Sequence, residues 1–465
     1  MAESESWRAL MRGPARARVA MVTLCIAVHA MDVFVTATIL PSVVADIGGT
    51  AFYAWPTAIY VVTAIMGTAS GGRLRLNYGM RRALIAAASI YLAGSLICAG
   101  APNMTVFLAG RTAQGLGGGL LASLAYVMIR ELFSERLRPR VFAMISTMWG
   151  AAALVGPALG GLFAELNFWR GVYWLTVPIF ATLVTLAWRN LEPREPRAEA
   201  SPQPWRRLFL LGGAVMCMTL SGQSDAFIGR IALIAGAMAG IAAMLWLDHR
   251  ADNRLFPTMP ASFRHPAGAG FWVLFLFAFS YTPISIFLPL VAQQLHDIPP
   301  SLAGYVAAAM SFGWTTAAIL ASGAAPRLQQ LLIVTGPVCL YAGIVGQSQF
   351  IVSGPIGALV AFVFLTGLGI GQCHAHISNR VMINARRGEE AVTAGTIPTM
   401  QSLGIAFGAA TGGLLANAAG LSGGISTATV TAVTDWIYGF SLFPAACVLL
   451  AAARLVWLLR ETKPQ

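Results

Sequence analysis

Asp32 is the residue of this chain best suited to chemistry, because it is the only acid in the apolar stretch RVAMVTLCIAVHAMDVFVTATILP at residues 18–41. This stretch is long enough to cross a lipid bilayer. A carboxylate at the centre of a membrane helix costs about 3 kcal/mol on insertion scales, so such an acid is a functional-site hypothesis. The alternative is a charge tolerated near a water-filled end of the helix. We therefore take Asp32 as the candidate proton carrier.

His29 and Thr36 lie three residues before and four residues after Asp32, so the three side chains share one face of a helix. We expect this face to point into a cavity, where Thr36 would contact a substrate. His29 could relay a proton or hydrogen-bond the carboxylate, because imidazole exchanges its proton near neutral pH. A histidine satisfied by a backbone or hydroxyl group is the alternative for this residue.

Arg111 is the basic residue that could neutralise Asp32. It lies about 12 Å into a span that begins near Asn103, and Asp32 lies at a similar depth from Pro41. If both spans end on the same side of the membrane, the two charges lie at one depth and could pair. A proton on Asp32 would then loosen the pair. Gln114, one turn below Arg111, could hydrogen-bond within the same cluster.

Other reactive side chains do not form a site. His374 and His376 are two positions apart, so on a helix they face away from each other and do not predict a metal site. The sequence shows no convergent catalytic cluster, so we expect neither an enzyme nor a cofactor. Six cysteines fall in apolar segments without a close pair, which predicts buried thiols rather than disulfides: Cys25, Cys98, Cys217, Cys339, Cys373 and Cys447.

The composition indicates a membrane protein that crosses the bilayer many times. Only 10% of residues are charged, 57% are hydrophobic and the mean hydropathy is +0.70, whereas a soluble domain is roughly a quarter charged. Each helical crossing needs about 20 apolar residues, and lipid cannot satisfy an open backbone, so we predict an all-α fold. Fourteen spans are expected, near 18–41, 51–72, 82–101, 104–129, 140–165, 168–188, 206–224, 229–247, 267–292, 301–322, 329–347, 354–379, 391–418 and 435–456.

The basic residues test this topology. With the N-terminus inside, all of the 30 Lys and Arg residues except Arg111, Arg170 and Arg230 fall on inner segments. The positive-inside rule therefore places both termini in the cytoplasm. The net charge of +12 is dispersed over these loops, which argues against nucleic-acid binding. The seventh and eighth spans are the weakest, and a twelve-span count is the alternative.

Two polar connectors divide the chain. The first, RNLEPREPRAEASPQPWRR at residues 189–207, is rich in Pro, Glu and Arg and cannot form a packed core. The second, ADNRLFPTMPASFRHP, follows the eighth span. We predict an N-terminal six-helix bundle over 1–188, a linker with two additional transmembrane helices over 189–265, and a C-terminal six-helix bundle over 266–465.

Glycine-rich motifs mark the first bundle. The chain reads GGRLRLNYGMRR at 71–82, RTAQGLGGG at 111–119 and GAAALVGPALGG at 150–161. Small residues let helices approach closely, and a proline permits a bend. Ordinary tight packing would give the same spacing in the third motif. The residues predicted to support conformational change are Gly72, Gly79, Arg81, Arg82, Gly150, Gly156, Pro157, Gly160 and Gly161.

In this order, the motifs resemble those of the major facilitator superfamily, and specifically its fourteen-span drug:proton antiporter branch. The resemblance covers essentially the whole chain and implies two six-helix bundles plus two extra central helices. The family's loop usually carries an acidic and then a basic residue where this chain has Leu76 and Asn77, so a charged latch there is not expected. Further matching residues are Asp32 with Pro41, Trp55, Tyr60, Trp169 with Arg170, and Gly367 to Gln372.

The second six-span bundle holds polar and aromatic residues but almost no mid-membrane charge. Such a surface suits lipophilic or amphipathic substrates, because apolar pockets with few polar groups bind broadly. For each aromatic, a lipid-facing or interfacial position is the alternative. The predicted substrate-cavity residues of the whole chain are Thr36, Gln114, Tyr281, Gln293, Gln294, Trp314, Gln372 and Gln401.

These features predict a secondary active transporter that couples inward protons to export of a lipophilic or amphipathic organic compound. It would work by alternating access, with substrate bound near mid-membrane between the bundles. Asp32, Arg111 and His29 would couple the proton. The partners would be the substrate, protons and the bilayer, and the protein would act as a monomer in a bacterial inner membrane. The alternative is a proton-linked or facilitative importer of a small metabolite, because a fold does not fix function.

Overall fold

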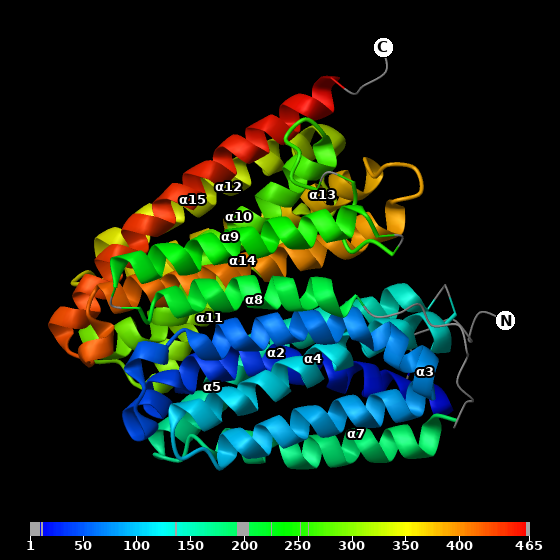
Figure 1. Ribbon diagram of the computed structural model, residues 1–465, viewed down its shortest axis with the longest axis horizontal. Coiled ribbons are helices and arrows are strands. Elements are labelled where there is room, and N and C mark those ends of the chain that lie inside the picture. The colour runs from blue at the N-terminus through cyan, green and yellow to red at the C-terminus, as the bar shows by residue number, and fades with distance from the viewer. Residues whose placement is uncertain are drawn as a thin grey trace. The chain divides into compact units, whose positions relative to one another are not determined.

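The computed structural model describes residues 10, 13–134, 137–192, 204–224, 226–251, 253–258 and 260–461, and every regular element among them is helical (Figure 1). Helices satisfy every backbone hydrogen bond within one segment, as a bilayer requires. The chain divides into two compact units. Unit 1 comprises Met1–Gly48 and Ile59–Gln203, and unit 2 comprises Gly49–Ala58 and Pro204–Gln465. Most of the predicted connector at 189–207 lies outside the described residues, and the predicted three-part division stays a prediction.

Unit 1 is a bundle of long helices. In it α2 packs against α4, α5 and α7, which surrounds the segment that carries Asp32. The helices are α2 (Gly13–Ile47), α3 (Trp55–Ala99), α4 (Met104–Leu132), α5 (Arg138–Glu165), the short α6 (Gly171–Trp174) and α7 (Thr176–Asn190).

Helix α3 reverses its direction at Gly79. The backbone there has φ 77 and ψ 160, a left-handed conformation that a residue with a Cβ rarely adopts. Two contacts require the reversal: Tyr60 reaches His29 of α2, and Tyr91, 31 positions further along α3, reaches Asp32 of the same helix. A straight helix would separate the two tyrosines by about 46 Å. The two halves of α3 therefore lie beside the same part of unit 1.

Unit 2 contains the remaining helices. In it α10 packs against α14 and α15, α13 packs against α11 and α12, and α8 packs against α9 and α14. The elements are η2 (Thr50–Phe52), α8 (Trp205–Ser221), α9 (Phe227–His249), α10 (Pro266–Leu295), α11 (Pro300–Ala321), α12 (Pro326–Phe350), α13 (Ile356–Ile383), α14 (Glu390–Ala418), η3 (Leu421–Gly423) and α15 (Thr427–Glu461).

The segment Gly49–Ala58 belongs to unit 2 although its neighbours in sequence belong to unit 1. Its Ala51 carbonyl accepts two hydrogen bonds, from Gln223 Nε2 at 2.6 Å and from Asn417 Nδ2 at 2.8 Å. Tyr53 stacks on Phe287 with ring centroids 5.0 Å apart. Polar and aromatic contacts thus hold this segment on α10, α14 and the turn after α8.

Glycines set the closest helix contacts in both units. A Cβ added at Gly115 or Gly119 of α4 would overlap the carbonyl oxygen of Tyr60 or Ala64, respectively. In unit 2, a Cβ at Gly367 or at Gly371 would overlap carbonyl oxygens of α11 in the same way. Backbones can approach this closely only where neither side chain intervenes.

Eleven helical stretches in the described part of the chain are long and apolar enough to cross a membrane. Residues Thr50–Ala99, which contain both halves of α3, count as one of the eleven. The 17-residue α8 and the helix α14 are not among them. The chain is therefore a multi-pass membrane protein, and the predicted count of fourteen stays a prediction.

Candidate functional site

The centre of unit 1 contains an ion pair between Asp32 of α2 and Arg111 of α4. The pair is bidentate, with Arg111 Nη1 2.6 Å from Asp32 Oδ1 and Arg111 Nη2 2.9 Å from Asp32 Oδ2. Asp32 is 8% exposed and Arg111 2% exposed. Two parallel charge-assisted hydrogen bonds of this kind are among the strongest polar contacts in proteins. The structure thus brings the two predicted charges together.

A hydrogen-bonded chain fixes the orientation of the pair. Arg111 Nη1 also donates to Gln114 Oε1 at 2.8 Å, and Gln114 Nε2 donates to Ser95 Oγ at 2.9 Å. Tyr91 donates its hydroxyl to Asp32 Oδ1 at 3.2 Å, and Ser95 Oγ donates to the Tyr91 carbonyl at 3.1 Å. Both charged groups are therefore held by neutral side chains of α3 and α4. A buried network of this kind is stable only when its members are satisfied.

Tyr60 connects His29 to the pair. Its hydroxyl lies 2.8 Å from His29 Nδ1, and the Arg111 guanidinium lies 4.4 Å from the centre of its ring. The ring of Trp149 meets the His29 ring edge-on at 6.0 Å. The hydrogen bond of His29 is thus to a phenol hydroxyl and not to Asp32. Its role in proton coupling stays a prediction.

Tyr91, Ser95 and Tyr60 were not predicted as site residues. Tyr91 and Ser95 lie four residues apart on an apolar segment, with Cys98 three residues further on. This spacing places all three on one face of α3. A polar stripe on an otherwise apolar span is the signal that could have identified them.

Two predicted glycines of α5 lie against α2 beside the site. A Cβ built on Gly156 would lie 2.6 Å from Phe34 Cβ, and one on Gly160 would lie 3.1 Å from Thr38 Cβ. Pro157 lies within the helix, and Gly161 is buried. Gly150, in contrast, has open space around it. Close approach of α5 to α2 therefore rests on Gly156 and Gly160. Thr36 is buried.

The loop motif at 71–82 is held by contacts that the sequence did not predict. Arg75 forms an ion pair with Glu131 at the end of α4, with Nε 3.1 Å and Nη2 2.9 Å from Oε2. The Arg81 guanidinium lies 3.5 Å from the centre of the Trp188 ring of α7. Gly72 has open space around it, and Arg82 is exposed. Charges thus connect α3 to α4 here, although Leu76 and Asn77 replace the family's charged residues.

The opposite ends of α2 and α3 carry a second charged cluster. Asp46 accepts hydrogen bonds from Trp169 Nε1 at 3.1 Å and from Arg170, and Arg170 Nη2 donates to the Ala101 carbonyl at 2.8 Å. The Arg170 guanidinium also lies 4.2 Å from the centre of the Trp169 ring. The Asp46 side chain is 48% exposed, so this cluster is accessible to solvent, unlike the Asp32 pair.

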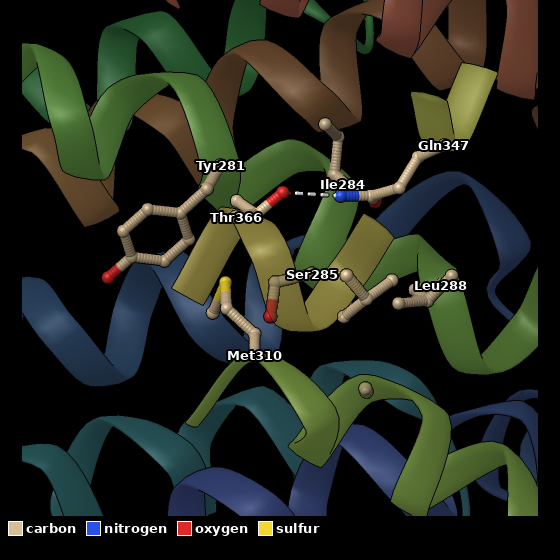
Figure 2. Close-up of a pocket in the computed structure, with 9 residues that line it drawn as sticks. Tyr281, Ile284, Ser285, Leu288, Met310, Gln347 and Thr366 are labelled. Atoms are coloured by element: carbon tan, nitrogen blue, oxygen red, sulfur yellow. Dashed lines mark hydrogen bonds between the residues drawn. The ribbon is translucent and has the colours of Figure 1, made fainter. Parts of the chain in front are cut away.

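Unit 2 contains a small pocket beside a buried cluster of hydrogen-bonded polar side chains (Figure 2). Gln347 Nε2 donates to Thr366 Oγ1 at 2.7 Å, and Tyr438 donates to Gln347 Oε1 at 3.0 Å. The pocket has room for about one water molecule, so it is far smaller than the site of a drug-sized ligand. The lining residues are Tyr281, Ile284, Ser285, Leu288, Ala307, Met310, Gln347, Val363 and Thr366.

Some predicted cavity residues of unit 2 lie together. Gln401 lies beside both Tyr281 and His374, and the His374 ring lies 5.2 Å from the Trp314 ring. Of the other predicted residues, Gln372 contacts Cys339 Sγ at 3.6 Å, Gln293 has a buried Nε2 without a hydrogen-bond partner among the described residues, and Gln294 is exposed.

The two units share a packing pattern, but the ion pair belongs to one of them. Gly160 approaches Thr38, and in unit 2 Gly408 approaches Thr282 in the same way. Asp32 lies six residues before Thr38, and Leu276 lies six residues before Thr282. Gly115 and Gly367 likewise make equivalent contacts with a neighbouring carbonyl oxygen. Arg111 lies four residues before Gly115, and Val363 lies four residues before Gly367. Aliphatic side chains therefore occupy in unit 2 the positions of the buried charges of unit 1.

Long apolar helices around a buried, hydrogen-bonded ion pair define a polytopic membrane protein with two opposite charges inside one unit. The chain belongs to the Major Facilitator Superfamily, whose family profile matches residues 22–409. It is a transporter, because relatives that align over nearly their full length are transporters.

Two curated relatives illustrate the match. A probable multidrug-efflux transporter of Mycobacterium tuberculosis is 30% identical over 464 residues, which cover 96% of this chain and 96% of that protein. Multidrug resistance protein 3 of Bacillus subtilis is 24% identical over 372 residues, which cover 75% of this chain and 69% of that protein.

Solved structures support the same fold. The POT family transporter PepTSo superposes with a TM-score of 0.64 at 13% identity, covering 97% of this chain and 98% of that chain. The xylose transporter XylE from E. coli superposes with a TM-score of 0.59 at 15% identity, covering 96% and 97%.

Proposed function

We propose that this transporter exports a lipophilic or amphipathic organic compound in exchange for protons, by alternating access. The observation that carries the proposal is the buried bidentate pair of Asp32 and Arg111, with Tyr91 and Gln114 as its neutral hydrogen-bond partners. Export is supported by the relatives named as multidrug-efflux and multidrug-resistance proteins.

The energetics of the pair favour its use as a proton switch. A proton on Asp32 removes one charge and leaves the Arg111 guanidinium, which cannot lose its own proton, buried without a counter-charge. Breaking a buried pair in this way costs about 3–5 kcal/mol. Reversing a two-state equilibrium from 1:99 to 99:1 takes about 5.5 kcal/mol. One protonation therefore supplies most of the free energy needed to change the preferred conformation.

The proposed topology has fourteen spans with both termini in the cytoplasm of a bacterial cell. The reversal of α3 at Gly79 divides one long helix into two halves of about 36 Å and about 30 Å, each long enough for one crossing. Counting α8 and α14 as crossings then gives the predicted number. The domain proposal keeps two six-helix bundles and treats α8 and α9 as additional helices, of which α8 packs on α14 and α9 packs on α8. A monomer is proposed as the functional form, and a bacterial inner membrane as its location.

Transport in everted membrane vesicles with an imposed pH gradient tests the proposal. Wild-type vesicles should accumulate a fluorescent dye such as ethidium when the interior is acidic, and nigericin should abolish this accumulation. Asp32→Asn should remove the response to the gradient. Asp46→Asn is the matched control, because that acid is half-exposed and lies outside the buried cluster. The proposal fails if Asp32→Asn exports as well as wild type and still responds to the gradient.

The vesicles also distinguish the direction of transport. An importer would deplete the dye from everted vesicles instead of concentrating it there. A parallel screen of growth tolerance to dyes, quaternary ammonium compounds and antibiotics, with and without the gene, identifies substrates. The roles of Thr36, Gln114 and the cavity residues of unit 2 are part of the proposal and are tested by the same export measurements.

A further inference from the structure

His374 is a partly buried residue that the proton mechanism does not use. Its Nε2 atom is buried and has no hydrogen-bond partner among the described residues. A buried group left unpaired costs about 1–3 kcal/mol. A ligand that supplies the missing partner would recover this free energy.

The surroundings of His374 are arranged like one wall of a binding site. The indole of Trp314 lies 5.2 Å from the imidazole at an interplanar angle of 48°, and Gln401 of α14 lies beside the imidazole. Trp314 comes from α11 and His374 from α13, where Gly371 brings the two backbones together at Trp314. Three helices of unit 2 thus fix an aromatic surface beside an unpaired ring nitrogen.

Tyr281 links this surface to the pocket of unit 2. Gln401 lies beside Tyr281, which also lines the pocket together with Met310 and Thr366. Figure 2 shows the Tyr281 hydroxyl pointing away from Thr366 and Gln347, so its ring forms part of the pocket wall. The empty pocket and the His374 surface therefore share one aromatic residue.

The chemistry of this surface selects one class of ligand. Trp314, Gln401 and Tyr281 carry no charge, and a buried cation without a counter-charge would lose its hydration. Flat aromatic rings pack well on Trp and imidazole faces, in stacked or edge-to-face geometry. A hydroxyl or amide group on the ligand could pair with His374 Nε2.

We propose that His374, Trp314 and Gln401 form a recognition site for an uncharged aromatic compound that carries a hydroxyl or amide group. His374 Nε2 supplies the hydrogen bond, Trp314 supplies the stacking surface, and Gln401 is a polar neighbour beside the imidazole. This inference rests on the proposed function for its setting, because it names one of the substrate classes of the exporter. The ion pair of unit 1 takes no part in it.

Equilibrium binding to the purified full-length protein in detergent tests the site without requiring transport. The probes are radiolabelled chloramphenicol and naphthol, which are uncharged and aromatic with hydroxyl groups, and dodecyltrimethylammonium, which is cationic and has no ring. His374→Leu should weaken chloramphenicol and naphthol binding about tenfold, equivalent to about 1.4 kcal/mol. Trp314→Leu should weaken them by a similar factor. Neither change should alter dodecyltrimethylammonium binding.

Thermal stability separates recognition from a structural role. Because His374→Leu replaces an unpaired buried nitrogen by an apolar group, the variant should unfold at the wild-type temperature or higher while binding less tightly. His376→Leu is the matched control, because that histidine lies two residues further along α13 and also has an unpaired buried Nε2, but it points to a different side of the helix. It should leave binding of the aromatic probes unchanged.

Several results would overturn the site. These are absence of chloramphenicol and naphthol binding by wild type, unchanged binding by His374→Leu, or equal weakening of all three probes. If His376→Leu weakens binding as much as His374→Leu, the site is not specific to the side of α13 that carries His374. Failure of the proton-coupled export is seen separately, as an Asp32→Asn variant that still responds to the gradient, and it leaves the binding result interpretable.

Discussion

Removing the charges of the Asp32–Arg111 pair one at a time and together should give three different stabilities. Both side chains are nearly inaccessible, at 5% and 2% exposure, and they share two short hydrogen bonds. Asp32→Asn leaves a guanidinium that stays charged at any accessible pH. We expect it to cost about 3–5 kcal/mol, the range for breaking a buried pair.

Arg111→Gln should cost less, because the remaining carboxyl can neutralise itself by taking up a proton. Its destabilisation should shrink as the pH falls, since a protonated Asp32 needs no counter-charge. The double variant Asp32→Asn/Arg111→Gln leaves no buried charge and keeps polar groups for Gln114 and Tyr91. It should recover most of the lost stability and should still lack proton coupling.

The measurement is the apparent unfolding temperature of each purified variant in detergent over a range of pH. The expected order is wild type, then the double variant, then Arg111→Gln, with Asp32→Asn the least stable at neutral pH. The reasoning is refuted if Asp32→Asn is as stable as wild type, which would mean that water solvates Arg111. It is also refuted if the double variant is less stable than both single variants.

Two further predictions follow from particular residues. Gly79→Ala places a Cβ on a residue with φ 77 and should cost about 1–2 kcal/mol of stability, seen as a lower unfolding temperature. Gly72→Ala is the control and should cost less, because Gly72 has open space around it. Equal losses of stability in the two variants would contradict the role of the positive φ at Gly79. Tyr91→Phe removes the hydroxyl that donates to Asp32, so it should cost about 1 kcal/mol of stability and slow pH-driven dye export in everted vesicles. Tyr126→Phe is the control and should leave export unchanged, because Tyr126 lies on the exposed surface of α4. Equal export by the two variants would show that the Tyr91 hydroxyl has no part in proton coupling.

The sequence predicted the helical class and the two charges of unit 1 for a physical reason. Apolar length identifies helices in a membrane protein, and depth along two helices shows which charges lie at one level. The same arithmetic did not show what surrounds the pair. Tyr91 and Ser95 reach Asp32 and Gln114 because α3 reverses at Gly79. The depth of these two side chains in the bundle depends on the geometry of that reversal, which the sequence does not give.

Contacts between distant segments were the hardest to predict. The spacing of His374 and His376 predicted that they face different sides of a helix. It did not predict that Trp314 and Gln401 lie beside His374. Arg75 pairs with Glu131, 56 residues away, although the motif itself lacks the expected charges. Such pairs depend on which helices become neighbours, and a single sequence carries no signal for that choice.

The placement of Gly49–Ala58 in unit 2 means that the chain crosses from one unit to the other three times. The first two crossings enclose only this short segment. Under the proposed alternating access, the ends of this segment are therefore points at which the chain itself would have to change conformation. One end is the glycine pair Gly48 and Gly49, with φ of 70 and 84, a conformation that glycine adopts without strain. The other end lies within the first turns of α3.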